Sequence, residues 1–190
     1  MPVFQNTFKR EFHVTDQALK PVVSSMYPIV VGMDNGLTAA AVVGQMDARG
    51  RLNILDEAYV PEGQTMGVET FLDRILVPLL QAKYGRPQGI LFVLDEACYQ
   101  RSQVNEVTIA QAVSSRGYNC VRASTNKPER RIAAVEGLLT RAIDGKAGML
   151  FSASVPWLIK AMDRGYRNKQ QINDVVTAVP AQNHYSHVAD

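Results

Sequence analysis

Residues 27–34, YPIVVGMD, decide the fold, because this apolar run ending on an aspartate is typical of a buried strand. Asn35-Gly36 follows at once and is a strong signal for a two-residue hairpin. Residues 38–46 then have the pattern of the returning strand, and a second tight turn leads to a third strand over 51–60. Three sequential strands joined by tight turns predict an antiparallel meander.

The hydrophobic period changes after this meander. Apolar residues at helical spacing over 68–80 predict a helix, and residues 89–95 form a second buried strand that ends on an aspartate. Two more helical stretches, expected to begin near Ser102 and Asn126, alternate with short strands. Strands joined by helical crossovers lie parallel. The order therefore predicts an α/β fold of the ribonuclease H-like kind: a mixed sheet, three antiparallel strands then parallel strands, with helices on both faces.

Length and composition indicate one globular domain. The chain has 190 residues, 46% of them hydrophobic and 20% charged. We predict an arm or linker over residues 1–26 and a single domain over 27–190. No apolar run approaches the length of a membrane span, and the N-terminus lacks the apolar core of a signal peptide. The two cysteines lack the partners of a zinc site. These observations predict a soluble, intracellular protein that is not secreted.

The formal net charge of +2 hides an asymmetry along the chain. Residues 34–100 carry five basic and nine acidic side chains, whereas residues 101–169 carry twelve basic and five acidic ones. Arginines outnumber lysines, 13 to 7, which favours forked recognition of phosphate or carboxylate. Clustering on a solvated surface is one interpretation. The other is an acidic centre beside a basic face, typical of an enzyme that holds metal and binds a polyanion.

Two carboxylates, Asp34 and Asp95, end the two buried strands. If these strands are neighbours, both carboxylates reach the same sheet edge, where they repel each other unless a cation lies between them. Oxygen ligands without cysteine favour Mg²⁺ or Mn²⁺ over zinc. Pairs of such cations held by carboxylates hydrolyse phosphodiesters. The pattern therefore predicts a site for divalent cations.

Several stretches resemble the nuclease domain of phage large terminase subunits. They are residues 32–45, Phe12–Val14 with Tyr27–Ile29, Thr125-Asn126 with residues 130–135, and residues 185–190. Their order and spacing cover roughly residues 8–190. The resemblance implies a terminase-type endonuclease of the ribonuclease H-like superfamily, which cuts double-stranded viral DNA during genome packaging with three acidic residues and two metal ions.

The resemblance also implies the site residues. Asp34, Asp95 and Asp190 would form the catalytic, metal-binding triad, with two Mg²⁺ or Mn²⁺ ions as cofactors. Where the family often has Asp-Pro-Ala, this chain has Asp95-Glu96-Ala97, so Glu96 is a candidate supplementary ligand. His187 precedes Asp190 by three residues and is a candidate to orient water or phosphate.

The basic half supplies candidate DNA contacts. They are Lys127, Arg130, Arg131, Arg141, Lys160 and Arg164, with Arg167 and Lys169 beyond them. By resemblance, the partners would be double-stranded DNA, the ATPase domain, the small terminase subunit and the portal, in the cytoplasm of the host cell. No GxxxxGK[ST] motif occurs, so no ATP-driven translocation is expected of this chain. We expect a nuclease domain cut from a longer protein.

Two alternatives remain open at this point. The residues from Asp34 to Thr38 resemble the phosphate-binding hairpin DxGxT of the actin and sugar-kinase superfamily, although the chain is about half the length such a protein needs. The other alternative is a non-catalytic module that docks on DNA or a packaging partner without cutting.

Overall fold

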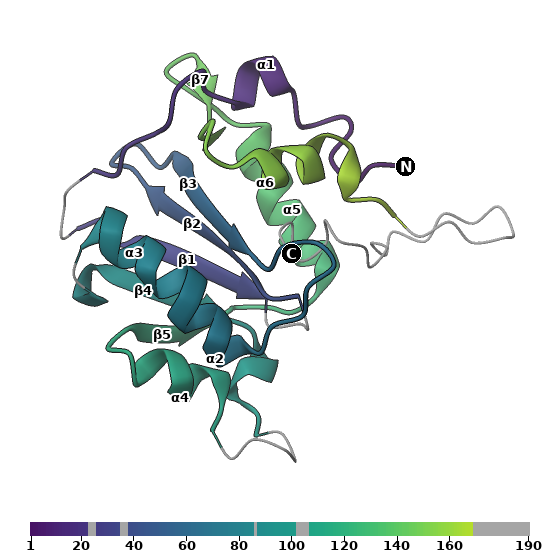
Figure 1. Ribbon diagram of the computed structural model, residues 1–190. Helices are drawn as coiled ribbons and strands as arrows, with labels where there is room; N and C mark the ends of the chain where they lie inside the picture. The colour runs from purple at the N-terminus through teal and green to yellow at the C-terminus, as the bar shows by residue number, and fades with distance from the viewer. Residues whose placement is uncertain (23–25, 35–37, 86, 102–106, 169–190) are drawn as a thin grey trace, which may run out of the picture.

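The computed structural model describes residues 1–22, 26–34, 38–85, 87–101 and 107–168 (Figure 1). Its elements follow one another in this order: α1 (Arg10–His13), β1 (Ile29–Asp34), β2 (Ala40–Met46), β3 (Leu52–Tyr59), α2 (Val68–Phe71), η1 (Leu72–Leu76), α3 (Val77–Tyr84), η2 (Pro87–Gly89), β4 (Ile90–Leu94), η3 (Glu96–Tyr99), α4 (Ile109–Ser114), β5 (Asn119–Arg122), α5 (Pro128–Leu139), β6 (Ala142–Ile143), β7 (Lys146–Ala147), β8 (Met149–Phe151), α6 (Pro156–Lys160) and η4 (Ala161–Gly165). No helix in these ranges is both long and apolar enough to cross a lipid bilayer.

The main sheet has six strands in the order β5-β4-β1-β2-β3-β8. The first three strands in the chain, β1 to β3, pair antiparallel as a meander. The pairs β1–β4, β4–β5 and β3–β8 are parallel. This topology confirms the ribonuclease H-like mixed sheet that the sequence predicts.

Each face of the sheet packs against its own set of helices (Figure 1). On one face Val31, Leu55 and Phe92 bury themselves against α2, η1, α3 and α4. On the other face Ile54 and Phe151 pack against α5 and α6. Because side chains alternate along a strand, β1 places Val31 and Met33 on the first face and leaves Gly32 and Asp34 to the second. That alternation decides which face carries the site.

Helix boundaries differ from the expectation in two places. The helix expected over 68–80 contains a π-helical turn, η1, which leads into α3 with Pro78 in its first turn. The three elements α2, η1 and α3 are continuous, so Pro78 removes one N–H from an unbroken helical run directly after the π-helical turn. The helix expected to begin near Ser102 begins at Ile109, where Thr108 and Gln111 form a capping box. Ser102 itself lies outside the described residues.

The described part of the predicted N-terminal arm is packed into the domain. Phe4 and Phe8 are buried in the core on the α5–α6 face. His13, in α1, is 1% exposed and its Nε2 lies 2.9 Å from the carbonyl oxygen of Leu139 at the end of α5. Because a carbonyl oxygen only accepts, Nε2 donates to Leu139, while Nδ1 lies 2.9 Å from the backbone N and 2.8 Å from the carbonyl oxygen of Lys9. Phe4, Phe8 and His13 of the segment predicted as an arm are therefore buried in the domain.

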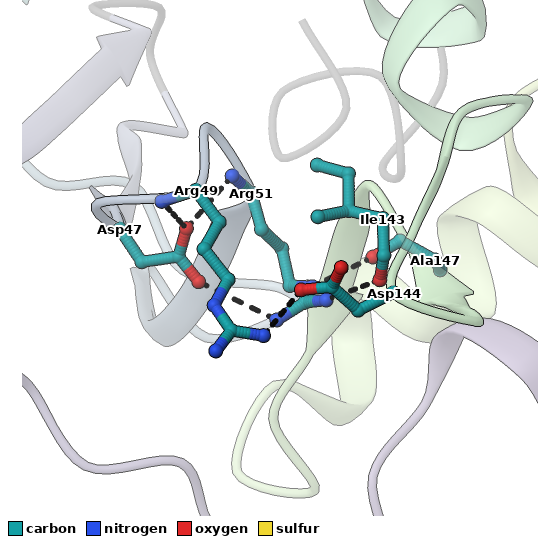
Figure 2. A network of polar contacts seen from close by, with 6 residues as sticks. All are labelled: Asp47, Arg49, Arg51, Ile143, Asp144 and Ala147. Atoms are coloured by element: carbon teal, nitrogen blue, oxygen red, sulfur yellow. Dashed lines mark hydrogen bonds and ion pairs between the residues drawn. The ribbon is translucent and has the colours of Figure 1, made fainter.

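A buried arginine joins the sheet to a small hairpin formed by β6 and β7 (Figure 2). Arg51 follows the β2–β3 turn, and its guanidinium donates hydrogen bonds to the carbonyl oxygens of Ala147 (2.9 Å) and Ile143 (2.7 Å). It also faces the Asp47 carboxylate at 3.4 Å. These three partners compensate for the burial of the Arg51 charge. Arg49 and Asp144 form a second, exposed ion pair across the same junction.

We expect Gly148→Ala to lower the free energy of unfolding by about 1–3 kcal/mol, because overpacking displaces close neighbours. A Cβ at residue 148 would lie 2.8 Å from the carbonyl oxygen of Leu138 and 2.9 Å from the Cβ of Arg141. Gly137→Ala is the matched control, since a Cβ there meets nothing within 4 Å and alanine stabilises a helix by roughly 0.5–1 kcal/mol over glycine. Urea unfolding of both variants gives the comparison, and equal stabilities would contradict it.

Candidate active site

Asp34 and Asp95 lie side by side at the ends of adjacent parallel strands. Gly32 of β1 is in register with Val93 of β4. Asp34 and Asp95 each stand two residues further on, so both point to the same face of the sheet as that pair. Neighbouring strands are about 4.8 Å apart. The structure therefore brings together the two carboxylates that the sequence placed at strand ends.

Asp95 is oriented by the short helical turn that follows it. As the N-cap of η3, it accepts a hydrogen bond from the backbone N–H of Cys98, at 3.1 Å. The Cys98 thiol is completely buried beside this carboxylate. Burial, together with a hydrogen bond to Asp95 and the negative charges of Asp95 and Asp34, raises the pKa of Cys98 to about 12. The thiol consequently stays protonated at neutral pH and is no nucleophile.

A cavity of about 650 Å³ opens between these carboxylates and helix α5. Asp34 and Asp95 line one side, and Arg130 and Arg131 from the first turn of α5 line it as well. The loop of residues 123–126 joins the two walls, and the remaining wall is largely apolar. Acidic and basic side chains therefore share one cavity, as a site for a phosphate and a cation requires.

The two carboxylates fit a hard divalent cation. Both supply oxygen ligands, and placing two like charges on neighbouring strands is unfavourable unless a cation neutralises them. Within the ranges that the structure describes, no group of three or more His, Cys, Asp or Glu side chains could hold a metal ion. The third predicted ligand, Asp190, and His187 lie outside the described residues. The described site thus provides two of the predicted ligands.

Glu96 has a different environment from Asp95. Its carboxylate is paired with the Arg122 guanidinium of β5, and that guanidinium also lies 4.3 Å from the centre of the Tyr99 ring. Glu96 does not line the cavity that contains Asp34 and Asp95. The structure therefore places this candidate supplementary ligand in a surface ion pair.

The predicted DNA contacts divide into separate groups. Arg130 and Arg131 line the cavity, and Lys127 immediately precedes α5. Lys160 lies over the Trp157 ring in α6. Arg141 follows the far end of α5, and Arg164 lies in η4 beside Asp163. Of these described side chains, Arg130 and Arg131 are the ones that line the cavity of Asp34 and Asp95.

Two contributors to the site escape sequence reasoning. Gly32 lines the cavity, and a Cβ there would meet nothing within 4 Å, so this position keeps the space beside the carboxylates open. Cys98 packs behind Asp95 although its sequence context gives it no partner. The sequence did hold one signal for this contact: Cys98 stands three residues after Asp95, and the side chain of a helical N-cap accepts a hydrogen bond from the backbone N–H at that position.

Comparisons with known proteins agree with this architecture. No protein-family model matches the sequence, and no curated protein does. Among solved structures, the large terminase from a thermophilic bacteriophage is similar, with a TM-score of 0.69 and 12% identity over 97% of this chain and 42% of that one. The same terminase in complex with ADP gives a TM-score of 0.71 at 12% identity, with the same coverage of both chains.

The P22 large terminase nuclease domain is also similar, with a TM-score of 0.52 and 13% identity over 79% of this chain and 72% of that one. The chain therefore has the fold of a terminase nuclease-like domain. It spans about two-fifths of the length of the thermophilic-phage terminase that it matches.

We expect Cys98 to resist alkylation by iodoacetamide in the folded protein at pH 8. The raised pKa leaves almost no thiolate at that pH, and the side chain is 0% exposed. Unfolding in guanidinium chloride should restore ordinary reactivity. Peptide mass spectrometry after a timed reaction measures both states, and rapid labelling of native Cys98 would contradict the packing described for it.

Proposed function

We propose that this chain is a metal-dependent endonuclease that cleaves double-stranded viral DNA during genome packaging. The observation that carries the proposal is the shared cavity in which Asp34 and Asp95 lie with Arg130 and Arg131. Carboxylates that bind cations and arginines that bind phosphate are the two components that phosphodiester hydrolysis requires. The fold shared with terminase nuclease domains supports the same proposal.

In this proposal Asp34 and Asp95 hold two divalent cations, Mg²⁺ or Mn²⁺, with Asp190 as the third ligand and His187 in support. When bound there, such cations would supply Lewis-acid stabilisation of the phosphate and would acidify a water molecule. The backbone N–H of Cys98 fixes the Asp95 carboxylate, which reduces the reorganisation needed to bind them.

Arg130 and Arg131 would hold the DNA backbone beside the carboxylates. Both lie in the first turn of α5, a helix of twelve residues whose N-terminal N–H groups carry partial positive charge. Lys127 precedes that turn and adds a cation. Bidentate contacts from arginine fix a phosphate in direction as well as in place. These residues would orient the scissile bond toward Asp34 and Asp95.

The proposed partners follow from the same comparison. The similar protein from the thermophilic phage is a large terminase more than twice as long as the part matched here. We therefore propose that this domain works with an ATPase domain, the small terminase subunit and the portal, in the cytoplasm of the infected cell.

Asp34→Asn and Asp95→Asn should each reduce Mn²⁺-dependent cleavage of supercoiled plasmid by about a hundredfold or more, since each loses a charged cation ligand. Asp144→Asn is the matched control. It makes the same chemical change in an exposed turn remote from the cavity, where φ is 50° and asparagine is tolerated. Agarose gels record nicking, and circular dichroism confirms folding.

Unchanged cleavage in both site variants would overturn the nuclease proposal. DNA binding without any cutting by the wild-type chain would favour the docking module instead. Tight ATP binding that both substitutions abolish would favour the actin and sugar-kinase alternative.

A separate test uses the open space at Gly32. We expect Gly32→Val to fold at least as stably as the wild type, because valine suits a strand and its Cβ would meet nothing within 4 Å. Its side chain would occupy the cavity beside Asp34 and should reduce cleavage more than Gly32→Ala does. Thermal melts and plasmid nicking measure the two effects, and undiminished cleavage by Gly32→Val would show that substrate does not enter this cavity.

A further inference from the structure

A cluster of two aromatic rings and one lysine lies on the same sheet face as the carboxylates. Asp34 is in register with Ala40 on β2, and Ala40 is in register with Tyr59 on β3. Residues directly opposite one another across strands share a face, with Cβ atoms about 5 Å apart. Tyr59 is therefore about 10 Å from Asp34 along one row of the sheet.

The cluster is built from β3 and α6. The Tyr59 and Trp157 rings meet edge to face with centroids 5.3 Å apart, and the Lys160 ammonium lies 5.6 Å from the centre of the Trp157 ring. Both aromatic side chains are half-buried, and Lys160 is exposed. Aromatic surface beside a cation is what base stacking and phosphate binding use together.

A half-buried carboxylate fixes the position of Trp157. Glu57 accepts hydrogen bonds from the backbone N–H groups of Trp157 (2.8 Å) and Leu158 (2.7 Å). Burial raises the pKa of Glu57, while these two hydrogen bonds and the charge of Lys160 oppose that rise. Leu158 also lines the cavity of Asp34. The backbone that carries the indole is thus anchored to β3 next to the site.

We infer that Tyr59, Trp157 and Lys160 form a stacking site for an unpaired base of the DNA strand held at Asp34 and Asp95. The inference rests on the proposed function and adds to it the form of the substrate: duplex with a locally unpaired strand. A separation of ~10 Å corresponds to about three stacked nucleotides, so one bound strand reaches both places. Lys160 neutralises the phosphate next to the stacked base.

The test uses Trp157 as its own probe, since it is the only tryptophan in the chain. The full chain carrying Asp34→Asn is titrated with a short oligothymidylate in EDTA, so that neither metal nor cleavage contributes. We expect saturable quenching of the tryptophan fluorescence by the oligothymidylate. An abasic strand of the same length, and a duplex, should quench it much less.

Variants separate stacking from simple charge attraction. Trp157→Ala should raise the Kd of a fluorescein-labelled oligothymidylate by about 5- to 150-fold, and Trp157→Phe by less, because an aromatic face remains. Lys160→Ala should weaken binding, whereas Lys146→Ala, the same change on the exposed β7 hairpin, should not. Melting curves check that each variant is folded.

The possible outcomes decide between the two proposals. Absence of quenching, or equal quenching by oligothymidylate and abasic strand, would overturn the stacking site. Base-dependent quenching in a chain that never cuts DNA would leave the stacking site standing and defeat the nuclease proposal. Cleavage by the wild-type chain, together with unchanged strand affinity in Trp157→Ala, would support the nuclease proposal and overturn the stacking site.

Discussion

The parallel pairing of β1 with β4 is the constraint on which the rest of the structure depends. β3 runs in the same direction as β1, because both are antiparallel to β2, so the chain must cross over before it can form β4 in that direction as well. The crossover runs through α2, η1 and α3, which cover one face of the sheet. Two carboxyl-terminal strand ends then meet at one edge, and Asp34 lies beside Asp95 as a consequence of topology.

Helix α5 covers part of the opposite face of the sheet and leaves the cavity beside Asp34 and Asp95 open. Helix α5 packs on the β3 and β8 side through Leu139 and Val135, while its first turn carries Arg130 and Arg131 to the cavity. The same helix therefore closes the core with its apolar side and lines the site with its charged end. Stability and chemistry are supplied by different residues of one element.

The sequence predicted the central strands and both carboxylates well, for a physical reason. Strands covered on both faces must be apolar almost throughout, so the aspartates that end residues 27–34 and 89–95 stand out. The start of α4 was also encoded, since Thr108 and Gln111 carry a capping-box signature. The apolar spacing before Ile109 nevertheless led to the prediction that this helix begins near Ser102. The metal ligands remain predictions, because Asp190 lies outside the described residues.

Other features depend on contacts that no local pattern reveals. The strands β6 and β7 have two residues each, too few to show a period. Phe4 and Phe8 lie in a polar segment and are buried only because α6 and β8 provide a surface for them. Whether Arg130 faces a carboxylate depends on where α5 settles, which tertiary packing decides. Glu96 could be assigned to Arg122 only once β5 was placed beside β4.

The buried guanidinium of Arg51 has a consequence for how the molecule opens. Detaching the β6–β7 hairpin would break both hydrogen bonds from the guanidinium to the carbonyl oxygens of Ile143 and Ala147 and leave Asp47 as its described partner. Partial opening at this edge is therefore costly, and the hairpin and the β2–β3 turn should exchange their amide protons as one cooperative unit. A hairpin too small to be stable alone thereby acquires the lifetime of the sheet to which Arg51 joins it.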